Sequence, residues 1–311
     1  MRKLTLITIL LLLVQCIVAQ ITYETVFIDY DSAWTFRNLK VIPVRAKGPA
    51  PAAVEVISLN QALERGMATI SERGTASTEN VHWVRIRNST SIPIFISSGE
   101  IVTGGRQDRM IAKDTVLHPT GTDQYLPAMC VEEGRWSNKE KKFQYHGFSG
   151  PALRKVMDQS HNQVKIWNEI YAQLDSAGIK SNSLAYGALR QENKKNPQQT
   201  DYLNYFMDKL EKTDRSILGV ICTSGNRILG TDIFAANNIF MDESSAILGG
   251  YIEEAVWTGA TPSVPDDEVY IEMDPVLKDE VSQDEYCRQH GKLFRYKGKV
   301  FHLAAYFKNN H

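Results

Sequence analysis

Short strand-like segments separated by turn residues fill the first half of this chain, and they restrict its fold more than any other feature. Between residues 100 and 131 the segments IVT, DRMIA, DTVLH and DQYLPAMCV follow one another with glycine, aspartate or proline between them. Each is too short for a helix, and apolar residues alternate with polar ones as in a strand with one buried face. The first half is therefore predicted to be mainly antiparallel β structure.

Further elements of the first half are expected on both sides of the proline- and alanine-rich loop at 46–53. Residues 22–44 predict strands, and Ser58 is a candidate N-cap for a short helix over 59–65 that Gly66 ends. A strand is expected over 68–72. Residues 81–88 and 91–97 read as a strand pair joined by a turn at Asn88-Ser89-Thr90.

The middle of the chain is predicted to be helical. Ser149 is a candidate N-cap, Pro151 lies in the first turn, and Gly178 can end the helix. Apolar residues recur at three- and four-residue spacing in one stripe along it: Leu153, Val156, Met157, Val164, Trp167, Tyr171 and Leu174. Two more helices are expected over 184–191 and 201–212, with a polar linker at 192–199 between them.

The end of the chain returns to β structure. Segments 217–223 and 227–234 flank a hairpin turn at Ser224-Gly225-Asn226, and Lys297-Gly298 marks a second hairpin within 291–307. A helix is expected over 244–258 and a linker over 260–267. The predicted fold class is α+β: an antiparallel, β-rich N-terminal half, central helices, and C-terminal hairpins that return to the sheet. Because these hairpins are expected to join the first half, residues 20–311 are treated as one domain.

Residues 1–19 have the features of a signal peptide. Arg2 and Lys3 precede a short apolar run, and Ile17 and Ala19 occupy the −3 and −1 positions of a cleavage site. The run is too short to span a bilayer. A lipoprotein signal ending at Cys16 is the first alternative, which Gln15 disfavours, and an uncleaved anchor is the second. The chain is thus predicted to be exported to the periplasm or beyond, with no membrane span left after processing.

Charge and cysteine content exclude several classes of protein. Loss of Arg2 and Lys3 would change the formal net charge from −1 to −3, so no basic surplus indicates nucleic acid as a partner. Cys130, Cys222 and Cys287 would remain, an odd number without a CxxC pair or a metal-type spacing. The sequence therefore predicts neither a disulfide framework nor a metal site, and it identifies no cofactor.

Residues 97–136 contain the side chains most suited to chemistry. Glu100 follows Gly99 at the end of a strand, where it is a candidate acid–base group. Arg106, Gln107 and Arg109 come after two glycines and are candidate ligand-binding residues, since arginine forks bind phosphate and carboxylate groups. The pattern is not a phosphate-binding P-loop. A solvated hairpin with local ion pairs explains the same residues.

The second group of candidates runs from Cys130 to Trp136. Cys130 is a candidate nucleophile, although its alternation with Leu126 and Ala128 equally predicts a buried apolar position. Glu132 could pair with Glu100 in acid–base work. Arg135 and Trp136 could hold an anionic ligand that contains a ring, by charge and stacking. His302, alone in an apolar strand, is read as a hydrogen-bonded core residue.

These segments resemble the ADP-ribosylglycohydrolase and rhodanese-phosphatase-associated protein domain, a family of unknown function. Its GEE-like, GAKQNR-like and PVSCVExGRW segments correspond here to Gly99-Glu100-Ile101, to residues 104–109 and to residues 127–136. The family's lysine is replaced by Arg106 and its asparagine by Asp108, so the resemblance does not carry over a mechanism that needs either residue. Its associations suggest NAD or ADP-ribose metabolism, and the resemblance covers most of the chain.

Two hypotheses for function follow. The preferred one is an exported, non-catalytic binding or structural domain in which a Glu/Arg/Trp network is buried and mutually satisfied. The alternative is a hydrolase-like enzyme that acts on an anionic small molecule, such as a compound bearing ADP-ribose or phosphate. In that case Glu100, Glu132 and Cys130 would be the catalytic candidates.

Overall fold

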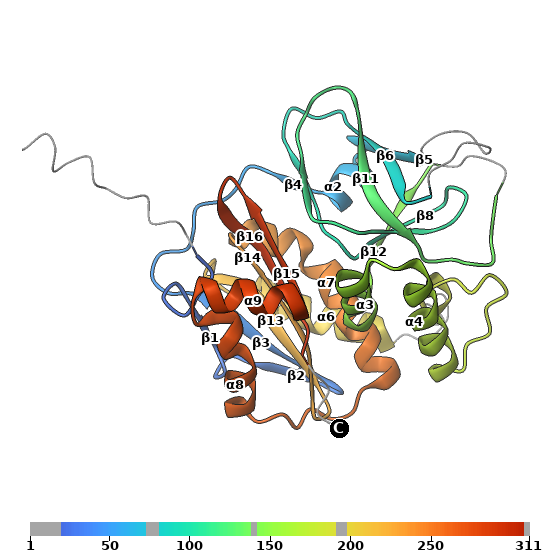
Figure 1. Ribbon diagram of the computed structural model, residues 1–311. Coiled ribbons are helices and arrows are strands. Elements are labelled where there is room, and N and C mark those ends of the chain that lie inside the picture. Colours follow the sequence, from blue (N-terminus) through green and yellow to red (C-terminus); the bar gives the residue numbers. More distant parts are fainter. Residues whose placement is uncertain (1–19, 73–80, 138–141, 191–197, 308–311) are drawn as a thin grey trace, which may run out of the picture.

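The chain forms two lobes, each built around its own β structure (Figure 1). The computed structural model describes residues 20–72, 81–137, 142–190 and 198–307. The smaller lobe comprises residues 57–148 and the larger lobe combines the two ends of the chain. Mixed helices and antiparallel sheets make the protein α+β, as predicted, and the C-terminal hairpin joins the larger sheet.

The larger lobe contains an antiparallel sheet that has seven strands within the described residues, in the order β1-β3-β13-β14-β16-β15, with β2 also paired to β3. Its strands are β1 (Val26–Ile28), β2 (Trp34–Phe36), β3 (Leu39–Ala46), β13 (Ile217–Ser224), β14 (Arg227–Phe234), β15 (Gly291–Tyr296) and β16 (Lys299–Ala305). The N-terminal strands thus pair with the C-terminal half of the chain. Both predicted C-terminal hairpins, β13–β14 and β15–β16, are confirmed.

Helices cover both faces of this sheet. The two pairs are α6 (Gln198–Glu211) with α7 (Asn237–Thr258), and α8 (Asp266–Leu277) with α9 (Glu280–His290). Strand alternation divides the core between them, since Val41 and Val220 pack with α6 and α7 whereas Ile42 and Ile221 pack with α8 and α9. Because both faces are covered, every residue of β13 is buried.

The smaller lobe consists of two sheets around one apolar cluster. The larger sheet contains β12 (Gln144–Phe148), β8 (Glu100–Thr103), β9 (Arg109–Ile111), β11 (Asp123–Cys130), β6 (Trp83–Asn88) and β5 (Ala68–Glu72), in that order. The other contains β10 (Thr115–Leu117), β7 (Ile94–Ile96) and β4 (Ile57–Ser58). Ser58 caps α2 (Leu59–Glu64) by accepting a hydrogen bond from Gln61 N, as predicted.

The predicted strand pair over 81–97 is wrong. β6 pairs with β5 and β11, while β7 pairs with β4 and β10 in the other sheet. The buried Asn88 side chain explains the change of direction, because its amide donates to the carbonyl oxygens of Ile92 and Leu117. Those bonds hold an irregular connection that directs the chain out of the first sheet.

The predicted long central helix is two helices, α3 (Pro151–Ser160) and α4 (Gln163–Ser176). His161 adopts a left-handed conformation with φ 44°, and Asn162 then caps α4. The predicted stripe holds only in part across the break. Leu153, Met157 and Leu174 are buried in one cluster, but Val164 is 59% exposed, and α4 buries Ile166 and Ile170 instead. The N-cap of α3 is Gly150, since the Ser149 hydroxyl donates instead to the carbonyl oxygen of Gly99 at 3.0 Å.

Other helix boundaries also differ from the sequence prediction. A helix was predicted over 184–191, and among the described residues the structure has a helical turn over 187–190. Most of the predicted linker at 192–199 lies outside the described residues, and α6 already includes its last two positions. α7 begins seven residues earlier than predicted, at Asn237 rather than Ser244. The helices α8 and α9 were not predicted at all, since charged residues interrupt their apolar pattern.

Candidate functional site

A cavity of about 770 Å³ lies where the smaller lobe and α3 meet α9 and β15 of the larger lobe. We refer to it as the inter-lobe cleft. Its lining includes polar side chains from both sides, among them Ser98, Asp114, Asp158 and Lys292. None of these four residues was a candidate in the sequence analysis.

Ser98 reaches the cleft on a tight turn between β7 and β8. Gly99 permits this turn with a φ of 97°, a conformation that side chains of L-residues rarely adopt. A Cβ atom at this position would also lie 2.6 Å from Cδ of Arg154. The glycine therefore allows the turn to pack directly onto α3, and it fixes Ser98 at the border between the lobes.

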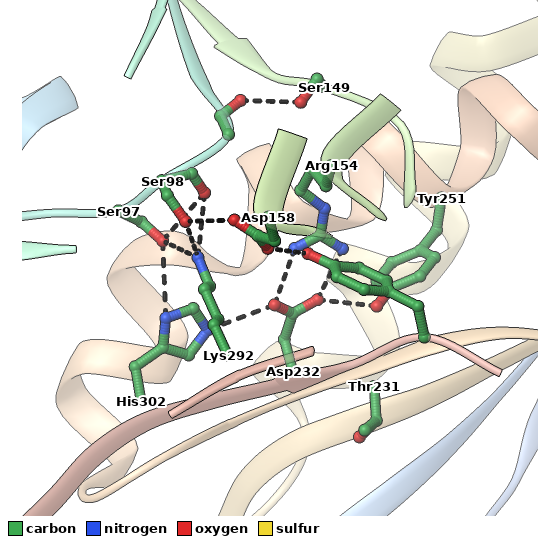
Figure 2. Close-up of polar contacts among 12 residues, drawn as sticks. Ser97, Ser98, Ser149, Arg154, Asp158, Thr231, Asp232, Tyr251, Lys292 and His302 are labelled. Carbon is green, nitrogen blue, oxygen red and sulfur yellow. Dashed lines mark hydrogen bonds and ion pairs between the residues drawn. The ribbon is translucent and has the colours of Figure 1, made fainter. Parts of the chain in front are cut away.

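The ammonium group of Lys292, on β15, is the centre of the polar contacts shown in Figure 2. It donates to the carbonyl oxygen of Ser98 at 3.0 Å and to Oδ1 of Asp114 at 2.7 Å, and it also contacts the Ser98 hydroxyl. Its side chain is 13% exposed. Lys292 thus places an ammonium group beside the hydroxyl of Ser98, a residue of the cleft lining that is itself almost fully buried.

Asp114 holds Lys292 from the side of the smaller lobe. One carboxylate oxygen accepts from Lys292 and from the Ser98 amide at 2.7 Å, and the other lies 2.6 Å from Nδ1 of His302. Burial alone would raise the pKa of Asp114, but Lys292 and His302 outweigh it and hold that pKa below its usual range. Asp114 is therefore a fixed anion with both oxygens occupied.

Behind Asp114 the contacts continue into the larger lobe. His302 faces Asp232 through its other ring nitrogen at 3.2 Å and stacks on Phe234, which agrees with its prediction as a hydrogen-bonded core residue. Asp232 pairs with both terminal nitrogens of Arg154, at 2.8 and 2.9 Å (Figure 2). Burial acts to raise the pKa of Asp232, but Arg154 and His302 lower it below the usual range.

Asp158 approaches the same serine from α3. Its Oδ1 lies 3.4 Å from the Ser98 hydroxyl, and its Oδ2 accepts from the Tyr306 hydroxyl at 2.8 Å. Burial raises the pKa of Asp158, and the nearby charge of Lys292 opposes this only in part. Two carboxyl groups beside Ser98, those of Asp114 and Asp158, thus have pKa values displaced in opposite directions, a pattern that recurs at acid–base sites.

The predicted residues Gln107, Glu132 and Arg135 do lie together, but elsewhere in the smaller lobe. Arg135 pairs with Glu132 and with Asp108, at 2.7 and 2.9 Å, and Gln107 donates to the backbone carbonyl of Glu132 at 2.8 Å. Glu132 and Gln107 are buried. This arrangement, which we call the hairpin cluster, joins the turn after β8 to the end of β11.

Arg109 and Arg106 extend the hairpin cluster. Arg109 is fully buried beside Glu72 at 3.5 Å, and Glu72 also accepts from the Arg106 amide at 2.6 Å. The Arg106 guanidinium lies 5.9 Å from the ring of Trp136, a cation–π contact on a half-exposed ring. The predicted arginines are thus engaged with groups of the protein itself.

Cys130 lies on the apolar side of β11, as the alternative interpretation of its strand predicts. It is buried, and the amide of Gln163 bonds both its backbone N–H and its carbonyl oxygen, at 2.8 and 2.7 Å. No disulfide involves Cys130, Cys222 or Cys287. Within the described ranges, no group of three or more His, Cys, Asp or Glu residues is arranged to hold a metal ion.

Glu100 does not join Glu132. Strand β8 pairs with β9 so that Val102 faces Arg109, which leaves Glu100 at the opposite end of the hairpin from the cluster. There Glu100 is fully buried and accepts from the Ser97 amide at 2.7 Å. Its electrostatic neighbours are Asp114, Lys292 and the buried Glu243 of α7. Glu100 therefore lies next to the inter-lobe polar groups rather than in the hairpin cluster.

The fold and these contacts define a class: a two-lobed α+β protein with a polar cleft where its lobes meet. The family model of the ARG and Rhodanese-Phosphatase-superfamily-associated Protein domain matches residues 27–307, and the chain belongs to that family. The resemblance found in the sequence is thereby confirmed. Comparisons with curated proteins and with solved structures gave no match. None of the helices in the described ranges has the length and apolarity to cross a membrane.

Proposed function

We propose that this protein binds an anionic small molecule in the inter-lobe cleft. The supporting observation is a pair of exposed cations on the cleft lining, Lys113 and Arg288, for which no carboxylate partner is found among the described residues. The other two cations of the lining are paired, Lys292 with Asp114 and Arg295 with Asp284. The third carboxyl group of the lining, Asp158, leaves four cations against three carboxylates even when it is charged. The cleft therefore carries a surplus of positive charge.

The rest of the lining suits an organic ligand rather than a bare inorganic ion. Trp83, Met129 and Phe294 contribute apolar and aromatic surface to the same lining. Pockets for small molecules commonly combine such surface with a few polar groups that fix orientation. We therefore assign the anion to the exposed cations and the uncharged part of the ligand to this apolar surface.

The test is a thermal-shift screen of the full chain with ADP-ribose, NAD and sugar phosphates, followed by calorimetry on the best probe. Removing both exposed cations in Lys113→Ala/Arg288→Ala should raise Kd about tenfold, because each exposed charge contact is worth up to ~1 kcal/mol. The parent affinity should also fall as salt is added. The proposal fails if no probe shifts the melting temperature, or if the double variant binds like the parent.

The matched control is Lys165→Ala/Lys180→Ala, which removes two exposed lysines outside the cleft lining. It should leave Kd unchanged. A second control uses the hairpin cluster, to which we assign a structural role because its polar groups are bonded to one another. Arg135→Ala should lower the melting temperature, since Glu132 and Asp108 lose their cation, and it should leave Kd unchanged.

We propose in addition that the protein is exported, with residues 20–311 as its mature unit. The basic start, the apolar run and the small Ala19 just before Gln20 support this. After expression of the full chain in a bacterium, N-terminal sequencing of the exported protein should begin at Gln20. Replacing Leu10 and Leu12 by arginine should block processing, since it interrupts the apolar run. A parent protein that keeps Met1 would contradict the proposal.

A further inference from the structure

We propose that Ser98 is a nucleophile that attacks the carbonyl carbon of a carboxylic ester in the inter-lobe cleft. The inference rests on the proposed function, because the exposed cations would hold the anionic part of the same molecule. It differs from the sequence hypothesis of a hydrolase, whose catalytic candidates were Glu100, Glu132 and Cys130.

The first argument is the position of Ser98. Its residue lines the cleft, and its hydroxyl lies between a cation from β15 and a carboxyl group from α3 (Figure 2). An activated serine needs a base within hydrogen-bonding reach and a group that stabilises the developing oxyanion. Asp158, 3.4 Å from the hydroxyl, meets the first need. Lys292 meets the second, because it is ion-paired with Asp114 and acts here as a cation.

The second argument is the rigidity of this arrangement. Lys292 is fixed by Asp114, and Asp114 is fixed in turn by His302 and by the Ser98 amide. His302 leads to Asp232, which Arg154 grips with two hydrogen bonds. The Ser98 turn thus rests on a continuous chain of buried polar groups, and such preorganised groups stabilise a transition state without having to rearrange.

The number of cations favours acyl over phosphoryl chemistry. Among the contacts found within the described residues, the ammonium of Lys292 is the cation that reaches the Ser98 hydroxyl. A single ammonium group suits the single oxyanion of a tetrahedral intermediate. Phosphoryl transfer spreads charge over three oxygens, which are ordinarily held by several cations.

The reaction balances without an oxidant or reductant. Ser98 Oγ forms a bond to the carbonyl carbon while its proton passes to Asp158, and Lys292 donates to the oxyanion. The bond to the leaving oxygen then breaks, and Asp158 returns the proton to that oxygen. Water next attacks the acyl carbon and gives a proton to Asp158. Ser98 Oγ leaves and takes up this proton, which releases the acid.

The experiment is covalent labelling of the full chain with a fluorophosphonate probe, which reacts with nucleophilic serines. Intact mass should show one adduct per chain, and peptide mapping should place it on Ser98. Ser98→Ala should not be labelled, whereas the control Ser263→Ala, at an exposed serine elsewhere, should be labelled like the parent. An unlabelled parent, or an adduct that maps to another residue, overturns the inference.

Asp158→Asn should slow labelling about a hundredfold at neutral pH, since a positioned general base contributes at least that much. An unchanged rate would refute the role of Asp158. Calorimetry with the anionic probe separates the two proposals. If the anionic probe binds but no adduct forms, the assignment of Ser98 as a nucleophile is overturned and the binding function stands. If an adduct forms on Ser98 but the anionic probe does not bind, the binding function is overturned and the nucleophile stands. Mapping on the parent decides the result even if Ser98→Ala does not fold.

Discussion

Asp232→Asn is expected to lower the free energy of unfolding by about 3–5 kcal/mol, the usual cost of breaking a buried ion pair by removing one charge. Asp232 is fully buried, and it accepts hydrogen bonds from both terminal nitrogens of Arg154 and from the Tyr251 hydroxyl at 2.7 Å. It also contacts His302. The substitution keeps the shape of the side chain but leaves the Arg154 charge inside the protein without its counter-ion. Urea unfolding at pH 7 measures the loss.

Asp266→Asn provides the matched control. Asp266 also pairs with a cation, Lys40 at 2.7 Å, but its side chain is 50% exposed. Exposed pairs contribute about 0–1 kcal/mol, so this variant should unfold almost like the parent. Equal losses of unfolding free energy in the two variants would mean that burial of the Arg154–Asp232 pair does not govern its contribution. They would also mean that the series of buried contacts leading from Lys292 to Arg154 is not rigidly held.

The parts of the fold that follow from local pattern were predictable from the sequence. The continuous apolar run of β13 and the turn at Ser224-Gly225-Asn226 specify their hairpin without help from the rest of the chain. Ser58 likewise caps α2 through a bond to Gln61, three residues away. These elements depend on interactions between near neighbours, which composition and spacing reveal.

The errors occurred where distant contacts decide the structure. Asn88 turns the chain because Leu117, far along the sequence, supplies an acceptor for its amide. Ser149 bonds Gly99 instead of capping α3. In the same way, the sequence grouped Glu100 with Glu132 because they are near each other along the chain. The pairing of β8 with β9 separates them.

The inter-lobe cleft could not be found from the sequence for the same reason. Its polar groups come from four separate regions: Ser98, Asp114, Asp158, and the hairpin that carries Lys292 and His302. None of these residues is part of a recognisable spacing. The one available signal was His302, a histidine in an otherwise apolar strand, which had to find polar partners somewhere in the core.

Glu100 and Glu243 form a second buried arrangement between the lobes. Glu100 is on β8 and Glu243 on α7, and both are almost completely buried. Each carboxyl group has one oxygen, Oε1, without a hydrogen-bond partner among the described residues. Burial raises the pKa of Glu100 to about 8, with a further contribution from Asp114, and the opposing effect of Lys292 is smaller. Burial and then the charge of Glu100 raise the pKa of Glu243 well above its usual value.

These shifts determine the direction of the pH dependence. In the unfolded chain a glutamate loses its proton near pH 4.5, whereas Glu100 keeps its proton in the folded protein up to about pH 8. The contribution of Glu100 to the free energy of unfolding is therefore fully present below pH 4.5. It is lost as pH rises from 4.5 towards 8, because the unfolded state then binds fewer protons than the folded state. A shift of this size corresponds to a loss of about 5 kcal/mol.

The double variant Glu100→Gln/Glu243→Gln should abolish most of this loss, since neutral amides of the same shape replace two groups that must otherwise hold protons. We expect its melting temperature to change little between pH 5 and pH 8 and to exceed that of the parent at pH 8. Glu211→Gln, at an exposed position on α6, should keep the parent profile. A double variant whose melting temperature falls as steeply as that of the parent would show that other groups set the pH dependence. A flat profile in the double variant alone would instead identify the two buried carboxyl groups as the source of the pH dependence, and would mean that the arrangement of Glu100 and Glu243 is most stable when both are protonated.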